Sequence, residues 1–187
     1  MTSELLVKHP SWQNIHMGVE KNSEAEVRAK LEGIYKRLWR YAFALSKSRD
    51  SADDIAQATC LKALEKAEQF QTGTHFDRWV FRIAQRLWLN ELRSSATRRG
   101  TGLVPVDDME FTDTRPTPEM NILNAEVLTS VLELNEQHRS VVFLAYVEGY
   151  SYKECAEILG IPIGTVMSRL AAARRKISTK FTSEGQE

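Results

Sequence analysis

Residues 151–176, SYKECAEILGIPIGTVMSRLAAARRK, determine the fold predicted for this chain. Ser151 followed by Glu154 forms a capping box, so a helix is expected to begin there. Gly160 is expected to end that helix, because glycine adopts the left-handed conformation of a C-terminal cap without a steric penalty. A second helix follows directly. Two short helices that cross at a glycine turn predict a helix-turn-helix.

The second of these helices, over residues 163–178, places Val166 and Leu170 on an inner face and polar or basic residues on the outer face. This arrangement suits a helix in the DNA major groove, where side chains reach base edges and phosphates. An ordinary helical hairpin is the alternative, since the helix macrodipole also favours Lys and Arg near a C-terminus. The residues expected to contact duplex DNA are Thr165, Ser168, Arg169, Arg174 and Arg175.

The composition is that of a globular protein, with 187 residues, 42% hydrophobic and 27% charged. The longest apolar runs are too short to span a membrane, and the first residues lack a signal-peptide core, so a cytoplasmic protein is expected. Cys60 and Cys155 are expected to be buried free thiols, and the four histidines form no cluster. No metal site and no cofactor are therefore expected. A nucleophile–base pair or phosphate loop is equally missing, so an enzyme is the least favoured class.

The net charge is zero, but opposite charges are separated into blocks. Residues 80–100 hold five arginines against one glutamate, and residues 101–126 hold six acidic residues against one arginine. The first block favours contact with phosphates, and the second favours avoidance of DNA.

Helical periodicity runs through most of the chain, and no strand-like alternation appears, so the fold class is all-α. Residues 1–23 are expected to be irregular, because Pro10 and Gly18 interrupt any helical period. Amphipathic helices are expected at about 23–46, 52–68 and 75–95, with a polar turn over 71–74. A flexible acidic linker then leads to the helices that precede the helix-turn-helix. The expected units are an N-terminal extension (1–23), a first helical domain (24–99), a linker (100–117), a second helical domain (118–180) and a tail (181–187).

Two helix faces in the first domain have more than one interpretation. Aromatic residues interleaved with arginines over 75–95 suit single-stranded nucleic acid, because bases stack on the rings while guanidinium groups hold phosphates. Trp79, however, equally fits a core stripe at helical spacing. The second face is either a partner surface or a solvated helix side. It consists of Asp54, Gln57, Ala58 and Leu61.

Two segments together resemble the conserved domains of bacterial RNA polymerase sigma factors of the extracytoplasmic-function (ECF) group. The first contains DDIAQATCLKALEKAEQF followed by HFDRWVFRIAQRLWLNELRSS. The second contains LNEQHRSVVFLAYVEGYSYKECAEILGIPIGTVMSRLAAARRKI. The resemblance covers roughly residues 25–100 and 120–178, in the family's order and spacing.

The resemblance implies a role for each segment. The Asp54 face would dock on the clamp coiled coil of core RNA polymerase, and the second helix of the helix-turn-helix would read the minus-35 element. The acidic linker would thread the RNA path of the polymerase. An anti-sigma factor would be a further partner, and no small-molecule substrate is implied. The loop and the third helix would capture a flipped minus-ten base through Phe70, His75, Phe76, Trp79, Arg82, Arg86 and Arg93.

Some positions depart from the family pattern. Ala58 stands where a glutamate is frequent and Cys60 where an aromatic residue is frequent, which puts the strength of polymerase docking in doubt. Met167 occupies a position where many members carry a larger or basic side chain. Two other functions remain open: a self-standing helix-turn-helix regulator of duplex DNA, and a sigma-like decoy that binds a regulator and never DNA.

Overall fold

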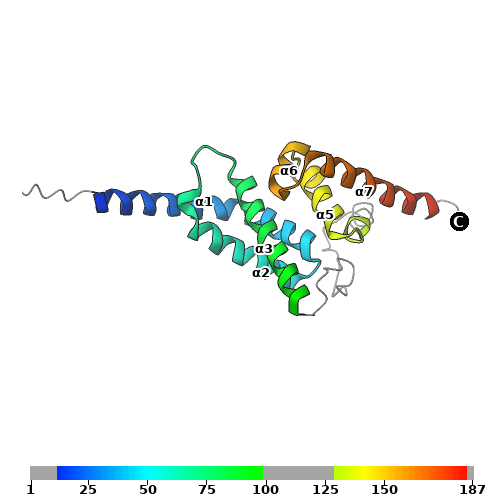
Figure 1. Ribbon diagram of the computed structural model, residues 1–187, viewed down its shortest axis with the longest axis horizontal. Coiled ribbons are helices and arrows are strands. Elements are labelled where there is room, and N and C mark those ends of the chain that lie inside the picture. The colour runs from blue at the N-terminus through cyan, green and yellow to red at the C-terminus, as the bar shows by residue number, and fades with distance from the viewer. Residues whose placement is uncertain (1–11, 99–128, 185–187) are drawn as a thin grey trace, which may run out of the picture.

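A computed structural model describes residues 12–98 and 129–184 of the chain, and all the regular elements within these ranges are helical. Figure 1 shows the helices arranged as two units that lie against each other. The all-α expectation is confirmed, and so is the division into two helical units with a helix-turn-helix in the second. The expected linker over 100–117 falls outside the described residues.

The first unit is built on a long helix, α1 (Trp12–Ser46), which packs against α2 (Arg49–Glu65) and α3 (Phe76–Arg98). A short 3-10 helix, η1 (Ala67–Gln69), joins α2 to the polar loop before α3. Apolar residues at helical spacing along α1 form the centre of this unit, together with small residues of α2 and an inner stripe of α3. The core residues include Val27, Leu31, Ile34, Leu38, Tyr41, Ala56, Ala63, Val80, Phe81, Ala84 and Trp88.

The start of α1 differs from the sequence prediction. Residues 1–23 were expected to be irregular, whereas helix α1 begins at Trp12; residues 1–11 lie outside the described part. Gly18 lowers helix propensity by only about 1 kcal/mol relative to alanine. Once the packed part of α1 supplies a nucleus, extension of the helix by further residues requires no new nucleation.

The boundaries of the next two helices are shifted by a few residues. Helix α2 begins earlier than expected because Ser48 is its N-cap, and the Ser48 hydroxyl accepts a hydrogen bond from the Ser51 amide. Asp50 and Ser51, the caps expected from the sequence, lie inside the helix. Helix α3 continues to Arg98, past the expected end near residue 95.

The second unit consists of a helical stretch at 129–132, then α5 (Glu136–Val142), the π-helical turn η2 (Phe143–Val147), α6 (Tyr152–Leu159) and α7 (Ile163–Glu184). Asn135 caps α5 as expected, and its side chain accepts a hydrogen bond from the His138 amide at 2.9 Å. Helix α7 extends to Glu184, so the tail expected from residue 181 is helical over its first four residues. The core of this unit comprises Leu134, Val141, Leu144, Cys155, Ile158, Val166, Leu170 and Ala173.

The cysteines are free thiols, as the sequence predicts, but only Cys155 is buried; Cys60 is half-buried. Burial raises the pKa of the Cys155 thiol to about 11.

No single helix within the described ranges is long and apolar enough to cross a membrane. Helices α6 and α7 meet such a test only when they are joined as a pair that is bent by 106°.

The two units share an apolar and polar contact surface. The ring of Tyr41 in α1 lies 5.6 Å from that of Phe143, and the ring of Phe81 in α3 lies 5.9 Å from that of Tyr150. The guanidinium group of Arg139 in α5 donates hydrogen bonds to the carbonyl oxygens of Ala44 and Leu45, in the last turn of α1. Because these contacts join α1 and α3 to α5 and the segment after it, the described parts form one continuous core.

Candidate nucleic-acid interface

The helix-turn-helix forms as its sequence predicts. The hydroxyl of Ser151 accepts a hydrogen bond from the Glu154 amide, and the Glu154 carboxylate accepts one from the Ser151 amide at 2.8 Å, which completes the capping box. Gly160 has φ 67° and ψ 36°, the left-handed conformation expected at this turn. The turn therefore aims α7 away from α6.

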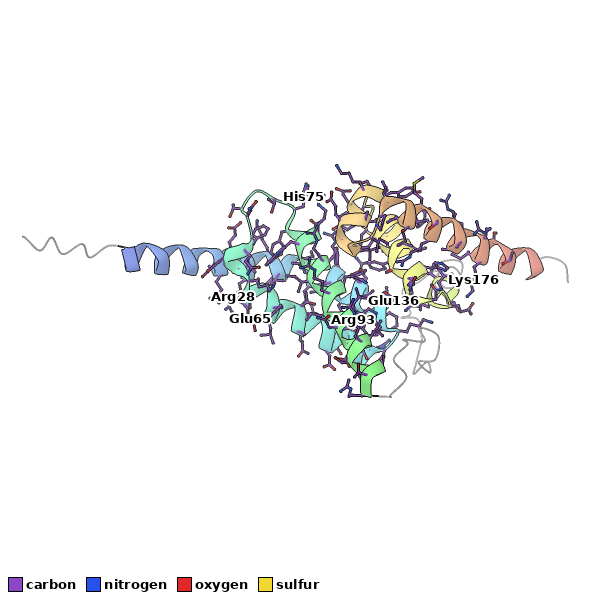
Figure 2. The ribbon with its side chains drawn as sticks, in the orientation of Figure 1. Arg28, Glu65, His75, Arg93, Glu136 and Lys176 are labelled. Carbon is purple, nitrogen blue, oxygen red and sulfur yellow. The ribbon has the colours of Figure 1, made fainter. Side chains whose placement is uncertain are left out.

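Helix α7 buries one face and exposes the other. Val166, Leu170 and Ala173 are fully buried against the unit's core. The predicted DNA contacts divide into two groups: the exposed side chains Ser168, Arg174 and Arg175, and the half-buried side chains Thr165 and Arg169. Lys176, labelled in the C-terminal half of α7 in Figure 2, is exposed as well. The outer face is therefore cationic toward its C-terminal half.

Two apolar side chains on α7 are exposed that the sequence analysis had not placed among the contacts. Ile163 is 49% exposed and Met167 is 53% exposed. They are one turn apart, at the N-terminal end of the helix, which is the end that reaches base edges in this motif. In the sequence, the four-residue spacing between these two apolar side chains was the signal that could have identified the pair.

Three aromatic rings gather where the polar loop enters α3. The ring of Phe70 lies 5.1 Å from that of Phe76 and 5.3 Å from that of Trp79. Phe70 is only 7% exposed, so its ring forms the floor of the cluster, whereas Phe76 and Trp79 are half-buried. Trp79 thus packs on the core and also keeps part of its surface accessible. His75, at the end of the loop, is exposed (Figure 2).

The predicted arginines of α3 differ in their surroundings. Arg86 and Arg93 are exposed, and Arg93 donates a hydrogen bond to the Asn90 side chain at 3.3 Å. Arg82 is half-buried, and its Nε is a buried donor without a hydrogen-bond acceptor in the described protein. Farther along, Arg98 pairs with Glu91 at 2.9 Å. Arg86 and Arg93 are therefore the arginines most accessible to a nucleic-acid strand that runs along α3.

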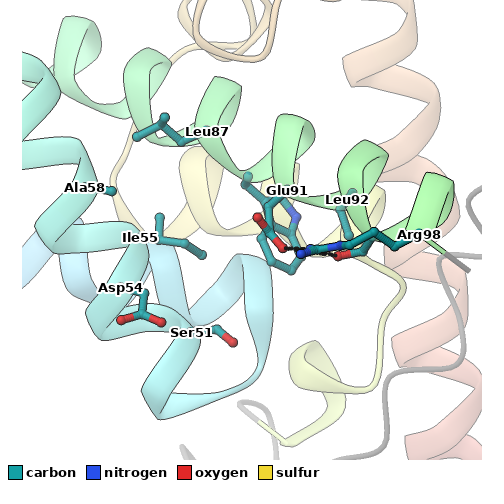
Figure 3. A pocket seen from close by; sticks show the side chains of 10 residues that line it. Ser51, Asp54, Ile55, Ala58, Leu87, Glu91, Leu92 and Arg98 are labelled. Carbon is teal, nitrogen blue, oxygen red and sulfur yellow. Dashed lines mark hydrogen bonds and ion pairs between the residues drawn. The ribbon is translucent and has the colours of Figure 1, made fainter.

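The predicted polymerase-binding residues share one open face of α2. Asp54, Gln57, Ala58 and Leu61 are all exposed, and Leu61 is 63% exposed. A groove of about 610 Å³ borders this face between α2 and α3. Figure 3 shows Asp54 and Ala58 on its α2 side and Leu87 on its α3 side, with the Glu91–Arg98 ion pair at one end. An exposed leucine beside a carboxylate and an apolar groove suits a protein partner.

The first turn of α3 is engaged by the second unit. Arg78, which the sequence had grouped with the other arginines of this helix, forms ion pairs with Glu154 at 3.3 Å and with Glu157 at 3.4 Å. The Tyr150 hydroxyl donates a hydrogen bond to Asp77 at 2.6 Å. Burial and the bond to Asp77 hold the pKa of Tyr150 well above its ordinary value. The helix-turn-helix unit therefore contacts the first turn of α3, the turn in which Phe76 of the aromatic cluster also lies.

Among the described residues, no three His, Cys, Asp or Glu side chains converge as metal ligands would. The groups that the described surface presents are exposed guanidinium groups, partly accessible rings, and hydroxyl groups on helices. These groups suit phosphates and bases.

Two family models match the chain, and each matches one unit. The model of sigma-70 region 2 matches residues 32–98, and that of sigma-70 region 4 matches residues 124–177. The aromatic cluster and the α2 face lie in the first match, and the helix-turn-helix lies in the second.

The chain is also similar to known sigma factors in sequence and to a solved one in fold. The ECF RNA polymerase sigma factor SigL of Mycobacterium tuberculosis is 33% identical over 164 residues, which are 86% of this chain and 91% of that protein. EcfG of Rhodopseudomonas palustris is 29% identical over 79% of this chain and 80% of its own length. The sigma factor RpoE of Bartonella quintana, solved in complex with the anti-sigma factor NepR, is similar in fold, with a TM-score of 0.72 and 24% identity. That match covers 84% of this chain and 97% of the solved one.

Proposed function

Because the chain belongs to the extracytoplasmic-function group of RNA polymerase sigma factors, we propose that it joins core RNA polymerase and directs initiation at promoters. The observation that carries this function is the presence of both sigma regions in one chain, each with an accessible recognition surface. The family acts in transcription without catalysing a reaction, and we assign none to this chain. Its proposed place of action is the cytoplasm, with polymerase and DNA.

Helix α7 is the proposed reader of duplex DNA at the minus-35 element. Arg174 and Arg175 would contact phosphates, while Ser168 and Arg169 would reach base edges nearer the N-terminus of the helix. The exposed Met167 adds an apolar surface, which fits the methyl group of a thymine better than a hydrogen-bonding edge. Thr165 completes the proposed contacts.

The aromatic cluster is the proposed site for the unpaired minus-ten strand. A flipped base needs a surface on which to stack and polar groups that read its edge. Phe76 and Trp79 offer the partly accessible rings over the Phe70 floor, and His75 offers a polar edge beside them. Arg82, Arg86 and Arg93 would hold the strand's phosphates along α3.

The open face of α2 is the proposed contact with core polymerase. Its carboxylate, amide and exposed leucine support a mixed protein interface, in which the apolar part is buried and the polar part pairs at the rim. An anti-sigma factor is a further proposed partner, supported by the solved complex of the similar protein RpoE with NepR.

Run-off transcription with purified core polymerase tests the function. We expect initiation on genomic DNA that depends on this chain, and sequencing of the transcripts then gives the promoter. Asp54→Ala with Gln57→Ala should weaken binding to the polymerase while leaving the fold intact, because both side chains are exposed. Binding to duplex operators without polymerase, and no dependence of initiation on the chain, would instead support a self-standing regulator.

A further inference from the structure

Two residues of α1 contact the proposed minus-ten site, although they precede the region 2 match, which begins at residue 32. The Thr72 hydroxyl in the polar loop donates a hydrogen bond to the Glu26 carboxylate at 2.9 Å. Lys30 forms an ion pair with the same carboxylate at 2.8 Å. Both the Lys30 bond and the Thr72 bond lower the pKa of Glu26, so the carboxylate stays ionised near neutral pH. The loop is thus connected to α1 through a charged pair.

The Lys30 ammonium group lies over the aromatic cluster. It is 4.8 Å from the centroid of Phe70 and 5.7 Å from that of Phe76, which are cation–π distances. Its side chain remains 38% exposed. The Lys30 cation therefore borders two rings of the proposed base site and also remains open to solvent.

The other cations around this cluster are more constrained. Arg78 is paired with two glutamates of α6, and the Arg82 Nε is buried. The single ion pair of Lys30 is exposed, and an exposed pair of this kind is weak. Lys30 can consequently exchange its partner at little cost when a phosphate arrives.

We propose that Lys30 is a nucleotide-binding residue of the minus-ten site: its ammonium group pairs with the phosphate of the nucleotide whose base stacks on Phe76. Glu26 is a positioning residue, which holds the lysine and, through Thr72, the loop. When the base takes the aromatic face, the ammonium group moves from the rings to the adjacent phosphate. This inference rests on the proposed function of the aromatic cluster.

The test is a salt titration of the full chain with a fluorescein-labelled pool of random 12-nucleotide single strands, followed by anisotropy. Loss of one phosphate contact lowers the slope of log K against log salt by about 0.7 for single strands. We expect that change for Lys30→Gln and no change for Lys30→Arg. Lys36→Gln, an exposed lysine on the same helix, is the matched control and should keep the full slope.

The Glu26→Ala variant separates the positioning role of Glu26 from the phosphate contact of Lys30. We expect weaker binding with an unchanged salt slope, since Lys30 still reaches the phosphate from a less ordered loop. Thermal unfolding by circular dichroism confirms that the variants fold. A Lys30→Gln slope equal to that of the wild type, or a wild-type chain that does not bind the pool, overturns the inference.

Run-off transcription tests the proposed function independently of the role of Lys30. Wild-type chain that drives initiation, combined with an unchanged Lys30→Gln slope, removes only the role of Lys30. Failure of the wild type to drive initiation with core polymerase removes the proposed function itself.

Discussion

Arg139 joins three segments at the scale of a single residue. Its guanidinium group donates hydrogen bonds to the carbonyl oxygens of Ala44 and Leu45, and to that of Leu134 in its own unit. A cation is favourable at the C-terminal end of a helix, where unpaired carbonyl groups give α1 a partial negative charge. Burial lowers the pKa of Arg139 to about 10, so it remains charged at neutral pH.

Arg139→Met is expected to destabilise the chain by about 3–5 kcal/mol. It removes the cation from the buried carbonyl groups of Ala44 and Leu45. It also removes the cation nearest the buried Glu136 carboxylate. Urea unfolding followed by circular dichroism measures the change. Arg86→Met, on an exposed surface of α3, is the control and should remain within about 0.5 kcal/mol of the wild type. A small effect of Arg139→Met would mean that water replaces the guanidinium group.

Glu136, one turn before Arg139, should make stability depend on pH. Burial raises the pKa of this carboxyl above its ordinary value of 4.5, against the opposing effect of Arg139. The folded chain therefore binds the proton more tightly than the unfolded chain, and stability falls as the pH rises from about 4.5 through the raised pKa. Glu136→Gln should flatten this part of the profile and gain stability relative to the wild type at pH 7. Urea midpoints from pH 4 to 8 provide the test, and parallel profiles would contradict it.

At the scale of an element, the effect of the Gly160 turn on the stability of the helix-turn-helix can be measured separately. Gly160 has a positive φ of 67°, and an added Cβ there would meet open space. Gly160→Ala should therefore cost only the backbone penalty of a left-handed residue, about 1–2 kcal/mol. Gly164→Ala, in the first turn of α7 and also facing open space, should be neutral or stabilising. Equal melting temperatures for the two variants would show that the turn relaxes.

A second prediction for a single element concerns DNA binding by helix α7. Arg174→Ala should reduce the slope of log K against log salt for duplex promoter DNA by about one, because one phosphate contact is lost. The side chain is exposed, so no loss of fold is expected. The measurement is a holoenzyme titration on the promoter found by transcript sequencing, with Lys36→Ala as control. An unchanged slope would mean that Arg174 faces solvent.

At the scale of the whole molecule, a charged contact adds to the apolar contacts between the two units. Arg37 in α1 donates a hydrogen bond to Glu148 at 2.6 Å, and the Glu148 side chain is only 2% exposed. Arg40, also in α1, lies 3.8 Å from the same carboxylate. The buried Glu148 side chain therefore has its cationic partners on the other unit.

Arg37→Glu should weaken the contact between the units, by about 1–2 kcal/mol once the partial exposure of Arg37 is taken into account. Small-angle X-ray scattering of the free chain is expected to give a larger radius of gyration for this variant. The double variant with Glu148→Arg should restore the compact form, and Lys36→Glu, with the same charge change on an exposed neighbour, should leave it unaltered. Identical scattering from all four proteins would show that the charged contact does not hold the units together.

The sequence by itself determined the helical class, the two units and the helix-turn-helix. These features follow from local signals: the Ser151–Glu154 capping box, the Gly160 turn and apolar spacing along each helix. Local signals also predicted the Asn135 cap. They were less reliable at helix ends, as the Ser48 cap and the start of α1 at Trp12 demonstrate, because propagation from a packed nucleus overrides weak breakers.

Only the tertiary structure decided which polar groups meet. Lys30 lies over Phe70, Arg78 pairs with Glu154, and Arg139 reaches Ala44 and Leu45, and each of these contacts joins residues that are 40 or more positions apart. Periodicity reports which face of a helix is buried, but not which residue of another helix covers it. The partners of a buried or bridging charge depend on how whole helices pack, and that packing is a property of the assembled core.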